Sequence, residues 1–328
     1  MRCIVDHTTD PYLNLAVEEY LLTTQQEPVF RLWRNIPSII VGRNQNTLSE
    51  INLHYVKDHN IPVVRRLSGG GAVFHDLGNI NYTFTDRYVP GMDTGSTFAR
   101  FTRPILEVLN TLGVKAELEG RNDLVTDGRK FSGNAIARYK DRILMHGTLL
   151  FSASMEDLSR ALQVKDREET RGVRSRPRSV CNLSEFLPPE ITALHFMELL
   201  KEHVTGSMAG KPSDRPLQPE EYKVIEALCE TGYSTFSWNY GSRHKWEFLR
   251  KKRFPGGNVE VCFNAPHGTI ESIKIYGDYF FFSPTEEIEK ALQGCPRTRE
   301  GIATCLQPFV WDDYFRNIPP EGLYELFL

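Results

Sequence analysis

The sequence is poor in cysteine and has no long apolar run. Its six cysteines form no Cys-x-x-Cys pair and no zinc-like spacing, which excludes a disulfide framework and indicates a reducing compartment. They are Cys3, Cys181, Cys229, Cys262, Cys295 and Cys305. No apolar segment approaches the roughly 18 residues of a membrane span, and the first residues lack the pattern of a signal peptide. We therefore expect a soluble, cytoplasmic protein with no membrane partner.

Neither sign of charge is in large excess. Lys and Arg number 39 against 42 Asp and Glu, a net charge of −3, which excludes the basic surface of a general nucleic-acid-binding protein. A phosphate ligand would therefore need a local basic site. Apolar residues make up 40% and charged residues 25% of the 328 residues, as in ordinary globular proteins. This length favours two domains.

Residues 1–247 predict a larger domain built around a sheet. Asp10-Pro11 before a helical apolar pattern predicts a first helix. A similar pattern from Phe98 to Leu112 predicts a second helix, kinked or begun at Pro104. Turn dipeptides between the apolar runs of residues 114–151 predict an antiparallel meander. The strands expected before it are Val29–Trp33, Ser38–Gly42, Ile61–Arg66, Ala72–His75 and Ile80–Thr85.

Residues 248–328 predict a small α+β accessory domain, joined by the basic segment Arg243–Arg253. Its three expected strands are Asn258–Asn264, Thr269–Tyr276 and Asp278–Phe282. The run Ser283-Pro284-Thr285-Glu286 predicts a capping box at the start of a helix that closes at Gly294.

The most informative segment is RRLSGGGAVFHDLGN at residues 65–79. Glycines between two strand-like runs leave backbone N–H groups open to an anion. It is neither a P-loop nor a Rossmann fingerprint, because the Gly-Lys-Ser/Thr ending and the following helix are missing. Arg65 and Arg66 should point to opposite faces of a strand, so at most one can face the loop. A plain glycine-rich turn with solvated arginines is an equal alternative.

A second constellation surrounds Asp127-Gly128, a strong signal for a two-residue hairpin turn. Counting from the turn pairs Val125 with Lys130 and Asp123 with Ser132, which places the Asp123 carboxylate and the Lys130 ammonium on one face. A lysine on a hairpin is ordinarily a solvated side chain, and this remains the alternative for Lys130.

The side chains of His146, His75 and Trp33 have an ordinary structural interpretation. His146 and Thr148 share a face of the strand predicted over 143–151. A histidine in such a strand is more often a hydrogen-bonded structural residue than a catalyst, and the same holds for His75. The apolar pattern around Trp33 predicts a core residue. The sequence shows no Ser/His/Asp order and no His/Cys metal spacing.

Taken in order, the motifs resemble bacterial lipoate–protein ligase A. They are NLAVEE (14–19), LWRN (32–35), IVGRNQ (40–45), the 65–79 run, Asn122–Leu124, KFSGN (130–134), HGTLL (146–150) and KIYGDY (274–279). The resemblance implies an α/β (α+β) fold, with a biotin/lipoate ligase-like catalytic domain of mixed sheets related to class II synthetase cores. It also implies the accessory domain at 248–328.

The resemblance implies an enzyme that activates lipoate or octanoate with ATP and Mg²⁺ to lipoyl-AMP. The acyl group then passes to a lysine of an apo lipoyl domain of 2-oxoacid dehydrogenase complexes or of the glycine-cleavage H protein. We expect a monomer. Lys130 is the implied catalytic residue, and Asp123 the Mg²⁺ ligand. The implied nucleotide site is Arg66, Ser68, Gly70, Gly71, Ala72, Val73, Phe74, Asn79, Asn122, Asp123 and Lys130. The implied acyl site is Glu18, Trp33, Arg66, His75, Lys130, His146 and Thr148.

Related enzymes are the main alternatives. Biotin–protein ligase is disfavoured because its Gly-Arg-Gly-Arg type of loop is absent. An octanoyltransferase acting through a thioester needs a cysteine near the site, and residues 60–150 contain none. A transferase that uses lipoyl-AMP but not ATP would share nearly every binding residue. A binding module without catalysis should not keep Lys130.

Two segments carry further expectations. The arginines of residues 171–178 are expected either to cover the adenylate, to meet an acidic acceptor, or to be simply solvated. Ser242-Arg243-His244-Lys245 departs from the family's usual continuation after Trp238–Gly241, which concerns the hinge between the domains.

Overall fold

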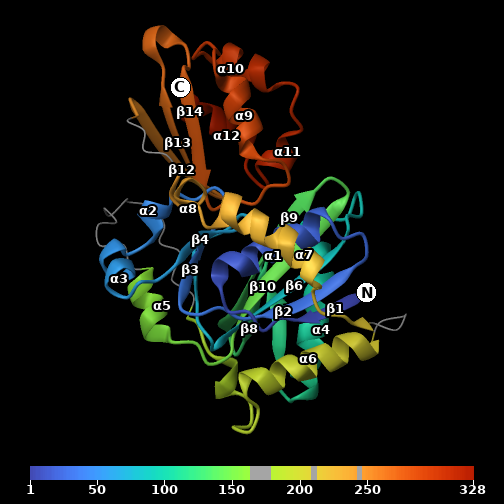
Figure 1. Ribbon diagram of the computed structural model, residues 1–328. Coiled ribbons are helices and arrows are strands. Elements are labelled where there is room, and N and C mark those ends of the chain that lie inside the picture. Colours follow the sequence, from blue (N-terminus) through green and yellow to red (C-terminus); the bar gives the residue numbers. More distant parts are fainter. Residues whose placement is uncertain (163–178, 208–212, 242–245) are drawn as a thin grey trace. The chain divides into compact units, whose positions relative to one another are not determined.

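The computed structural model describes residues 1–162, 179–207, 213–241 and 246–328 (Figure 1). The arginine-rich segment 171–178 and the departure at 242–245 lie outside these residues. The chain divides into two compact units. Unit 1 comprises residues 1–40, 51–64 and 73–235, and unit 2 comprises residues 41–50, 65–72 and 236–328.

Unit 1 is built on an eight-stranded mixed sheet, in the order β11-β1-β2-β6-β10-β9-β8-β7. The strands are β1 (Arg2–Val5), β2 (Val29–Trp33), β6 (Asn79–Arg87), β7 (Ala116–Glu119), β8 (Asp123–Thr126), β9 (Arg129–Tyr139), β10 (Arg142–Leu150) and β11 (Ser213–Asp214). β1 is parallel to both of its neighbours, whereas the β7–β10 meander is antiparallel as predicted. The mixed sheet confirms the predicted fold class.

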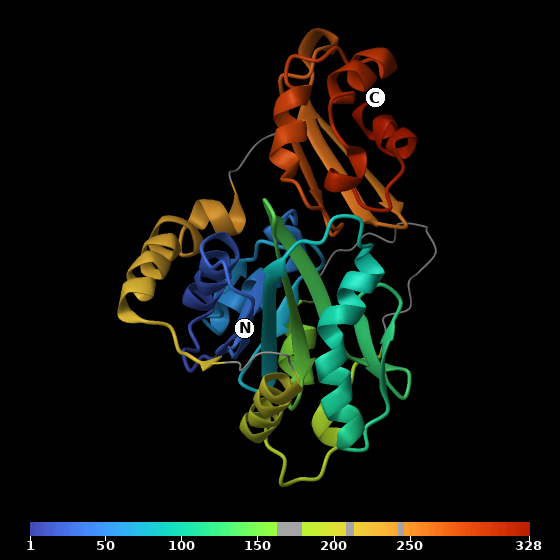
Figure 2. The same cartoon turned by 90° about the vertical axis from the view of Figure 1, so that its right-hand side faces the viewer.

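Helices cover both faces of this sheet. Figure 2 shows α1 (Pro11–Thr23) and α7 (Pro219–Leu228) on one side and α4 (Thr94–Thr111) on the other. Asp10 caps α1 as predicted, accepting a hydrogen bond from the backbone N–H of Tyr12 at 2.8 Å. The alternative that this helix begins at Pro104 is wrong. α4 begins at Thr94, where the Asp93 side chain caps it, and Pro104 lies inside the helix. The remaining helical segments of unit 1 are α3 (Leu53–Asp58), α5 (Met155–Ala161), η1 (Leu183–Glu185), α6 (Ala193–Ser207) and η2 (Cys229–Tyr233).

A small sheet with the order β4-β3-β5 carries the glycine-rich segment. Its strands are β3 (Ser38–Val41), β4 (Val63–Arg65) and β5 (Val73–His75). The glycines connect β4 to β5, so the segment lies between two strands, as the sequence predicts. Unit 2 contains the short helices α2 (Thr47–Glu50) and α8 (Phe236–Tyr240).

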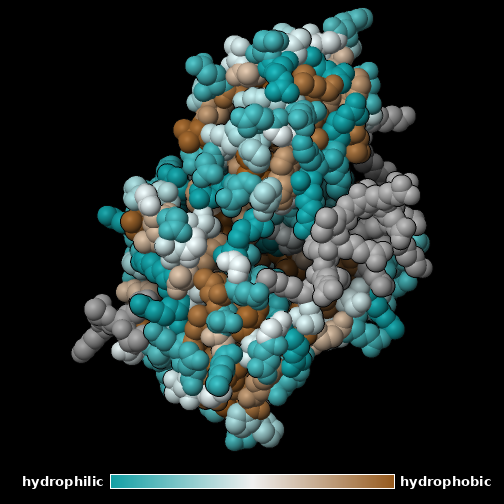
Figure 3. Space-filling view, turned by 180° about the vertical axis from the view of Figure 1, so that it is seen from behind, coloured by the Kyte–Doolittle hydropathy of each residue, from teal (hydrophilic) through white to brown (hydrophobic). Residues whose placement is uncertain are grey.

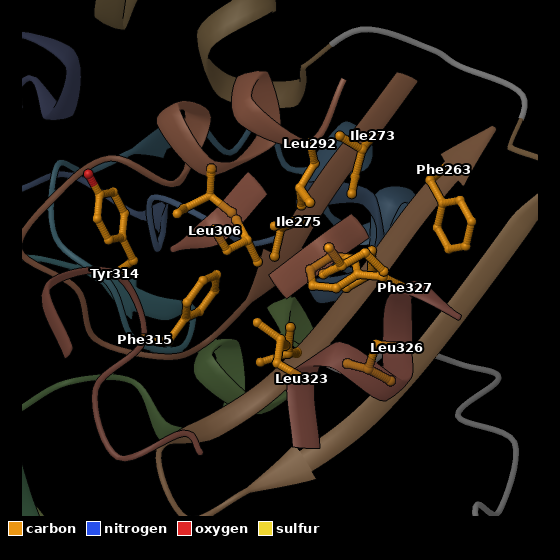
Figure 4. Close-up of a cluster of buried hydrophobic side chains, with 14 of the residues drawn as sticks. Phe263, Ile273, Ile275, Leu292, Leu306, Tyr314, Phe315, Leu323, Leu326 and Phe327 are labelled. Carbon is orange, nitrogen blue, oxygen red and sulfur yellow. The ribbon is translucent and has the colours of Figure 1, made fainter. Parts of the chain in front are cut away.

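The accessory part of unit 2 packs a three-stranded antiparallel sheet against helices. The strands are β12 (Phe248–Phe254), β13 (Gly257–Asn264) and β14 (Ser272–Gly277). After η3 (Pro266–Gly268) between β13 and β14, the helices are α9 (Thr285–Leu292), α10 (Arg299–Leu306), α11 (Trp311–Tyr314) and α12 (Pro320–Phe327). Figure 4 shows their shared core, with Phe263, Phe315 and Leu323 fully buried.

Two predictions for this part are wrong. Residues 278–282 form no strand, and the third strand is β12, whose basic side chains lie exposed at the edge of the sheet. Because β12 is rich in basic residues, its sequence resembles that of an exposed linker. The capping box does not form, because α9 begins at Thr285 with Pro284 as an N-cap that has no side chain to accept a hydrogen bond.

No described helix is both long and apolar enough to cross a membrane. In the view of Figure 3, hydrophilic residues cover most of the face shown, and hydrophobic residues occur in separated groups.

Candidate functional site

The β8–β9 hairpin brings Lys130 and Asp123 together. The Lys130 Nζ lies 2.9 Å from Asp123 Oδ1, which confirms the predicted proximity. The turn is the predicted one, with positive φ at Asp127 and Gly128. Asp123 pairs with Gly133 rather than with Ser132, because a β-bulge after Leu124 shifts the register.

Several contacts fix this lysine. Its backbone N–H donates to Ser179 O at 3.0 Å, and its carbonyl accepts from the N–H of Cys181 at 3.0 Å. A Cβ on Gly133 would lie only 3.0 Å from the ammonium, so glycine leaves room for the charge. The Lys130 side chain is 31% exposed. The interpretation of Lys130 as a freely solvated side chain is therefore wrong. Its backbone is hydrogen-bonded, its ammonium pairs with Asp123, and its side chain is still accessible to solvent.

Cys181 is a neighbour that the sequence reasoning missed. It lies outside residues 60–150, yet the chain returns at Val180 to form a bridge with Lys130. The Cys181 thiol is buried, lies 3.7 Å from the carbonyl oxygen of Arg129, and burial raises its pKa. A buried protonated thiol is a poor nucleophile.

An asparagine pair organises the base of the same hairpin. The Asn134 amide donates to Asn122 O at 2.9 Å, and the Asn122 amide donates to Asn134 O at 2.5 Å. The Tyr82 hydroxyl donates to Asn134 Oδ1. Thr148, predicted from the strand alternation, accepts a hydrogen bond from the backbone N–H of Gly133 at 3.3 Å. Asn122 and Thr148 are thus tied to the strand that carries Lys130.

Glu18 and His146 form a buried hydrogen-bonded pair on the face of the sheet covered by α1. Glu18 Oε2 lies 2.8 Å from His146 Nδ1, and the Thr83 hydroxyl donates to Glu18 Oε1 at 2.6 Å. The Trp33 indole N–H donates to Thr83 Oγ1 at 2.9 Å. Burial alone would raise the pKa of Glu18, but His146, the Thr83 hydroxyl and Arg31 hold it below its usual value.

Thr83 links Glu18 to Trp33 and was not predicted from the sequence. The alternation of polar side chains along β6, which places Asn79, Asn81 and Thr83 on one face, could have indicated it. Trp33 is buried, as the core interpretation expects, and His146 is hydrogen-bonded, also as expected. Both side chains nevertheless belong to one network with Glu18.

His75 and Asn79 also lie within unit 1. The His75 ring is buried, its Nδ1 is 3.1 Å from the amide nitrogen of Asn35, and its centroid is 6.1 Å from that of Trp33. Asn79 donates to Asn81 Oδ1 at 2.9 Å. Within the residues described, Asn79 Oδ1 is buried and accepts no hydrogen bond. It is a polar atom that a ligand or a water molecule could satisfy.

The glycine segment folds around Arg66, in unit 2. Its guanidinium donates to Gly69 O at 2.7 Å and to Gly71 O at 2.8 Å, and its Nε donates to Ser68 Oγ at 3.0 Å. Arg65 points elsewhere and donates to Gln45 O at 2.7 Å. The prediction that only one of the two arginines faces the loop is confirmed, and both side chains are buried rather than solvated.

Arg65 fastens the base of the loop to α8. Its backbone N–H donates to Asn239 Oδ1 at 2.8 Å, and its carbonyl accepts from the Trp238 indole at 2.8 Å. Arg43 stacks over the Trp238 ring at 4.4 Å and pairs with Glu286 at 2.8 Å. Burial lowers the pKa of Arg65 to about 10, and the guanidinium stays charged at neutral pH.

The three consecutive glycines have different surroundings. A Cβ on Gly69 would lie 2.3 Å from Tyr279 O, so this glycine allows a backbone approach. Gly70 has φ +93°, a left-handed conformation that favours glycine. A Cβ on Gly71 would meet no described atom within 4 Å. Gly71 is thus the open position of the loop.

The segment continues through Ala72 into β5. Val73 pairs with Ile40, and Phe74 pairs with Ile39. Phe74 is buried and Val73 is half-buried. Both side chains therefore help to build the small sheet, and a ligand would meet mainly the backbone before them.

The residues present do not form a resident metal site. Within the described ranges there is no cluster of three or more His, Cys, Asp or Glu that could hold a metal ion. Asp123 is one carboxylate, paired with Lys130. A single carboxylate is compatible only with Mg²⁺ that arrives on substrate phosphates.

Profiles of two protein families match the chain. Residues 10–205 match the lipoyl protein ligase A/B catalytic domain, and residues 244–327 match the bacterial lipoate protein ligase C-terminus. A lipoate-protein ligase LplJ of Bacillus subtilis is 40% identical over 321 residues, covering 97% of this chain and 96% of that protein.

Solved structures agree with the sequence matches. The structure of P. falciparum LipL1 in complex with lipoate has a TM-score of 0.77 and 26% identity, covering 99% of this chain and 97% of that one. A lipoate-protein ligase A bound with ATP has a TM-score of 0.64 and 26% identity, covering 73% and 98%. A bipartite ligase of Thermoplasma acidophilum, described with its E2 lipoyl domain, has a TM-score of 0.66 and 26% identity, covering 75% and 98%.

Proposed function

The chain belongs to the lipoate–protein ligase family, and from this premise we propose that it activates lipoate with ATP and transfers the lipoyl group to a lysine of a lipoyl domain. The observation that carries the proposal is the ion pair of Lys130 and Asp123 on the β8–β9 hairpin. It supplies a fixed positive charge, which both half-reactions need.

In the first half-reaction, a lipoate carboxylate oxygen forms a bond to the α-phosphorus of ATP, and the bond to pyrophosphate breaks. Two anions must approach each other, so positioned cations and backbone donors lower the barrier. We assign the cation to Lys130, held in place by Asp123 at 2.9 Å. Asp123 then acts as a positioning residue.

The glycine segment supplies the phosphate cradle in this proposal. Gly71 offers an unobstructed backbone, and Arg66 fixes the loop through the carbonyl oxygens of Gly69 and Gly71. Ser68, Gly70 and Ala72 shape the same bend. Mg²⁺ enters with ATP as part of the substrate. The binding of ATP by a structural relative supports this assignment.

In the second half-reaction, the amine of the acceptor lysine attacks the acyl carbonyl carbon. The carbon–oxygen bond to AMP breaks, and the amine gives up a proton. The lipoyl-AMP anhydride must be kept from water until then. We assign the acyl site to the buried network of Glu18, Thr83, Trp33 and His146, because the ionised Glu18 fixes the orientation of the imidazole. His75 and Thr148 complete the proposed site.

We assign catalysis to residues 1–247 and an accessory role to residues 248–328. The two profile matches support this division, since the first ends at residue 205 and the second begins at residue 244. Unit 2 nevertheless includes the glycine segment and α8 together with the accessory part. The acceptor is proposed to be a lipoyl domain of a 2-oxoacid dehydrogenase complex or an H protein, as the relative described with an E2 lipoyl domain suggests.

A reconstituted reaction tests the proposal. The purified chain, MgATP, lipoate and an apo lipoyl domain should yield a lipoylated domain, read by intact mass. A domain whose acceptor lysine is replaced by arginine is the matched control. Absence of product with ATP and lipoate, but product with supplied lipoyl-AMP, would identify a transferase that cannot activate lipoate.

A thioester route is disfavoured by the surroundings of Cys181. Its backbone N–H donates to Lys130 O at 3.0 Å, yet the residue is 1% exposed and burial raises its pKa. An octanoyltransferase nucleophile needs access and thiolate character. Cys181 has neither.

A further inference from the structure

Two cysteines of the accessory part are in direct contact. Cys305 Sγ lies 2.7 Å from Cys295 Sγ. This separation is too short for two thiols that merely pack together, and it approaches the roughly 2 Å of a covalent S–S bond. We propose that Cys295 and Cys305 form a reversible dithiol–disulfide site that low-molecular-weight disulfides oxidise and small thiols reduce.

Both cysteines lie on segments whose backbone is already held in place. Cys295 follows α9, and its carbonyl accepts from the N–H of Ile270 at 2.9 Å. The preceding Gly294 N–H donates to Ile270 O at 2.7 Å. Cys305 belongs to α10, whose first turn is capped by the Thr298 side chain. Bond formation therefore needs only a small movement of the two sulfur atoms.

The difference in exposure sets the order of the chemistry. Cys305 is partly exposed and Cys295 is buried, so a small disulfide reaches Cys305 first. The Cys305 thiolate attacks the reagent RSSR, which forms a mixed disulfide and releases one RS⁻. The Cys295 thiolate then attacks Cys305 Sγ, which forms the S–S bond and releases the second RS⁻. The two protons lost by the cysteines pass to the two RS⁻, so the protein loses two electrons and the reagent gains them.

The second step should be the slower one at neutral pH. Burial raises the pKa of the Cys295 thiol well above its ordinary value. Since the thiolate is the attacking species, ring closure should accelerate as the pH rises. A covalent link between α10 and the segment after α9 should also stabilise the accessory part against unfolding.

Cys262 offers a matched control within the same part of the chain. It is buried, as Cys295 is, and its thiol contacts the Glu260 carboxylate at 3.8 Å. Exchange of Cys262 for alanine should leave oxidation unchanged. Exchange of Cys295 for alanine should stop the reaction at the mixed disulfide on Cys305.

The test uses the full-length chain treated with oxidised glutathione and then alkylated in denaturant. Trypsin cuts after Arg297 and Arg299, between the two cysteines, so the proposed bond appears as two linked peptides. We expect this linked pair, four alkylated cysteines and a higher melting temperature that reverts with dithiothreitol. Alkylation of all six cysteines, or a mixed disulfide on Cys305 that persists at pH 9 beside an alkylated Cys295, would overturn the proposal. The wild-type chain decides this, whatever the stability of the variants.

Discussion

Exchange of Gly71 for alanine should separate nucleotide binding from folding. The added methyl group would meet no described atom within 4 Å, and Gly71 is not at a position with a left-handed φ. Gly-to-Ala changes of this kind stabilise a fold by about 0.4–1 kcal/mol, because the unfolded chain loses freedom. The same methyl group would stand where the loop backbone is proposed to approach the phosphates. Loss of one hydrogen bond to a charged group costs about 1.5–3 kcal/mol, or roughly ten- to a hundredfold in affinity.

Gly69→Ala provides the matched control. Its Cβ would lie 2.3 Å from the carbonyl oxygen of Tyr279, so the backbone must move and the fold should lose about 1–3 kcal/mol. Calorimetry with ATP and thermal melting of both variants give the comparison. Gly71→Ala should bind ATP more weakly without a lower melting temperature, whereas Gly69→Ala should melt earlier. Wild-type ATP affinity in Gly71→Ala would refute the cradle.

Three further outcomes follow from individual contacts. Lys130→Ala should abolish lipoate-dependent pyrophosphate release and raise the barrier for transfer from supplied lipoyl-AMP by on the order of several kcal/mol, as expected for loss of a preorganised charge. Lys130→Arg should restore activity only in part. Near-normal pyrophosphate release by the alanine variant would contradict the assignment. Cys181→Ala should keep its ligase activity, measured as lipoylated domain per minute, and a loss of activity with intact folding would revive the thioester route. The Arg2 ion pair lowers the pKa of Glu221 to about 2, so its stabilising contribution is complete above the ordinary value of about 4.5 and is lost as the pH falls through about 2. Urea unfolding of Glu221→Gln should therefore show a weaker loss of stability over that range than the wild type, and parallel curves would count against the pair.

The sequence predicted those parts of the site that depend on local spacing. The contact of Lys130 with Asp123 followed from counting outward from Asp127-Gly128, even though the bulge changed one pairing. The opposite orientations of Arg65 and Arg66 followed from strand alternation.

Contacts made by distant segments could not be predicted in this way. The Cys181 N–H reaches the Lys130 carbonyl beside a bridge between Val180 and Lys130 that only the folded chain forms. Thr83 meets Glu18 across a helix–sheet interface. The strand β12 was missed for another reason: an edge strand can keep alternate basic side chains in water, so its pattern resembles that of a linker.

Lipoate-dependent exchange of labelled pyrophosphate into ATP, with no acceptor domain present, tests the central claim most directly. We predict exchange that needs the chain, Mg²⁺ and lipoate or octanoate together, and that disappears in Lys130→Ala while this variant keeps its melting temperature. A folded wild-type chain that catalyses no exchange, yet transfers lipoyl groups from supplied lipoyl-AMP, would contradict the claim that this protein activates lipoate.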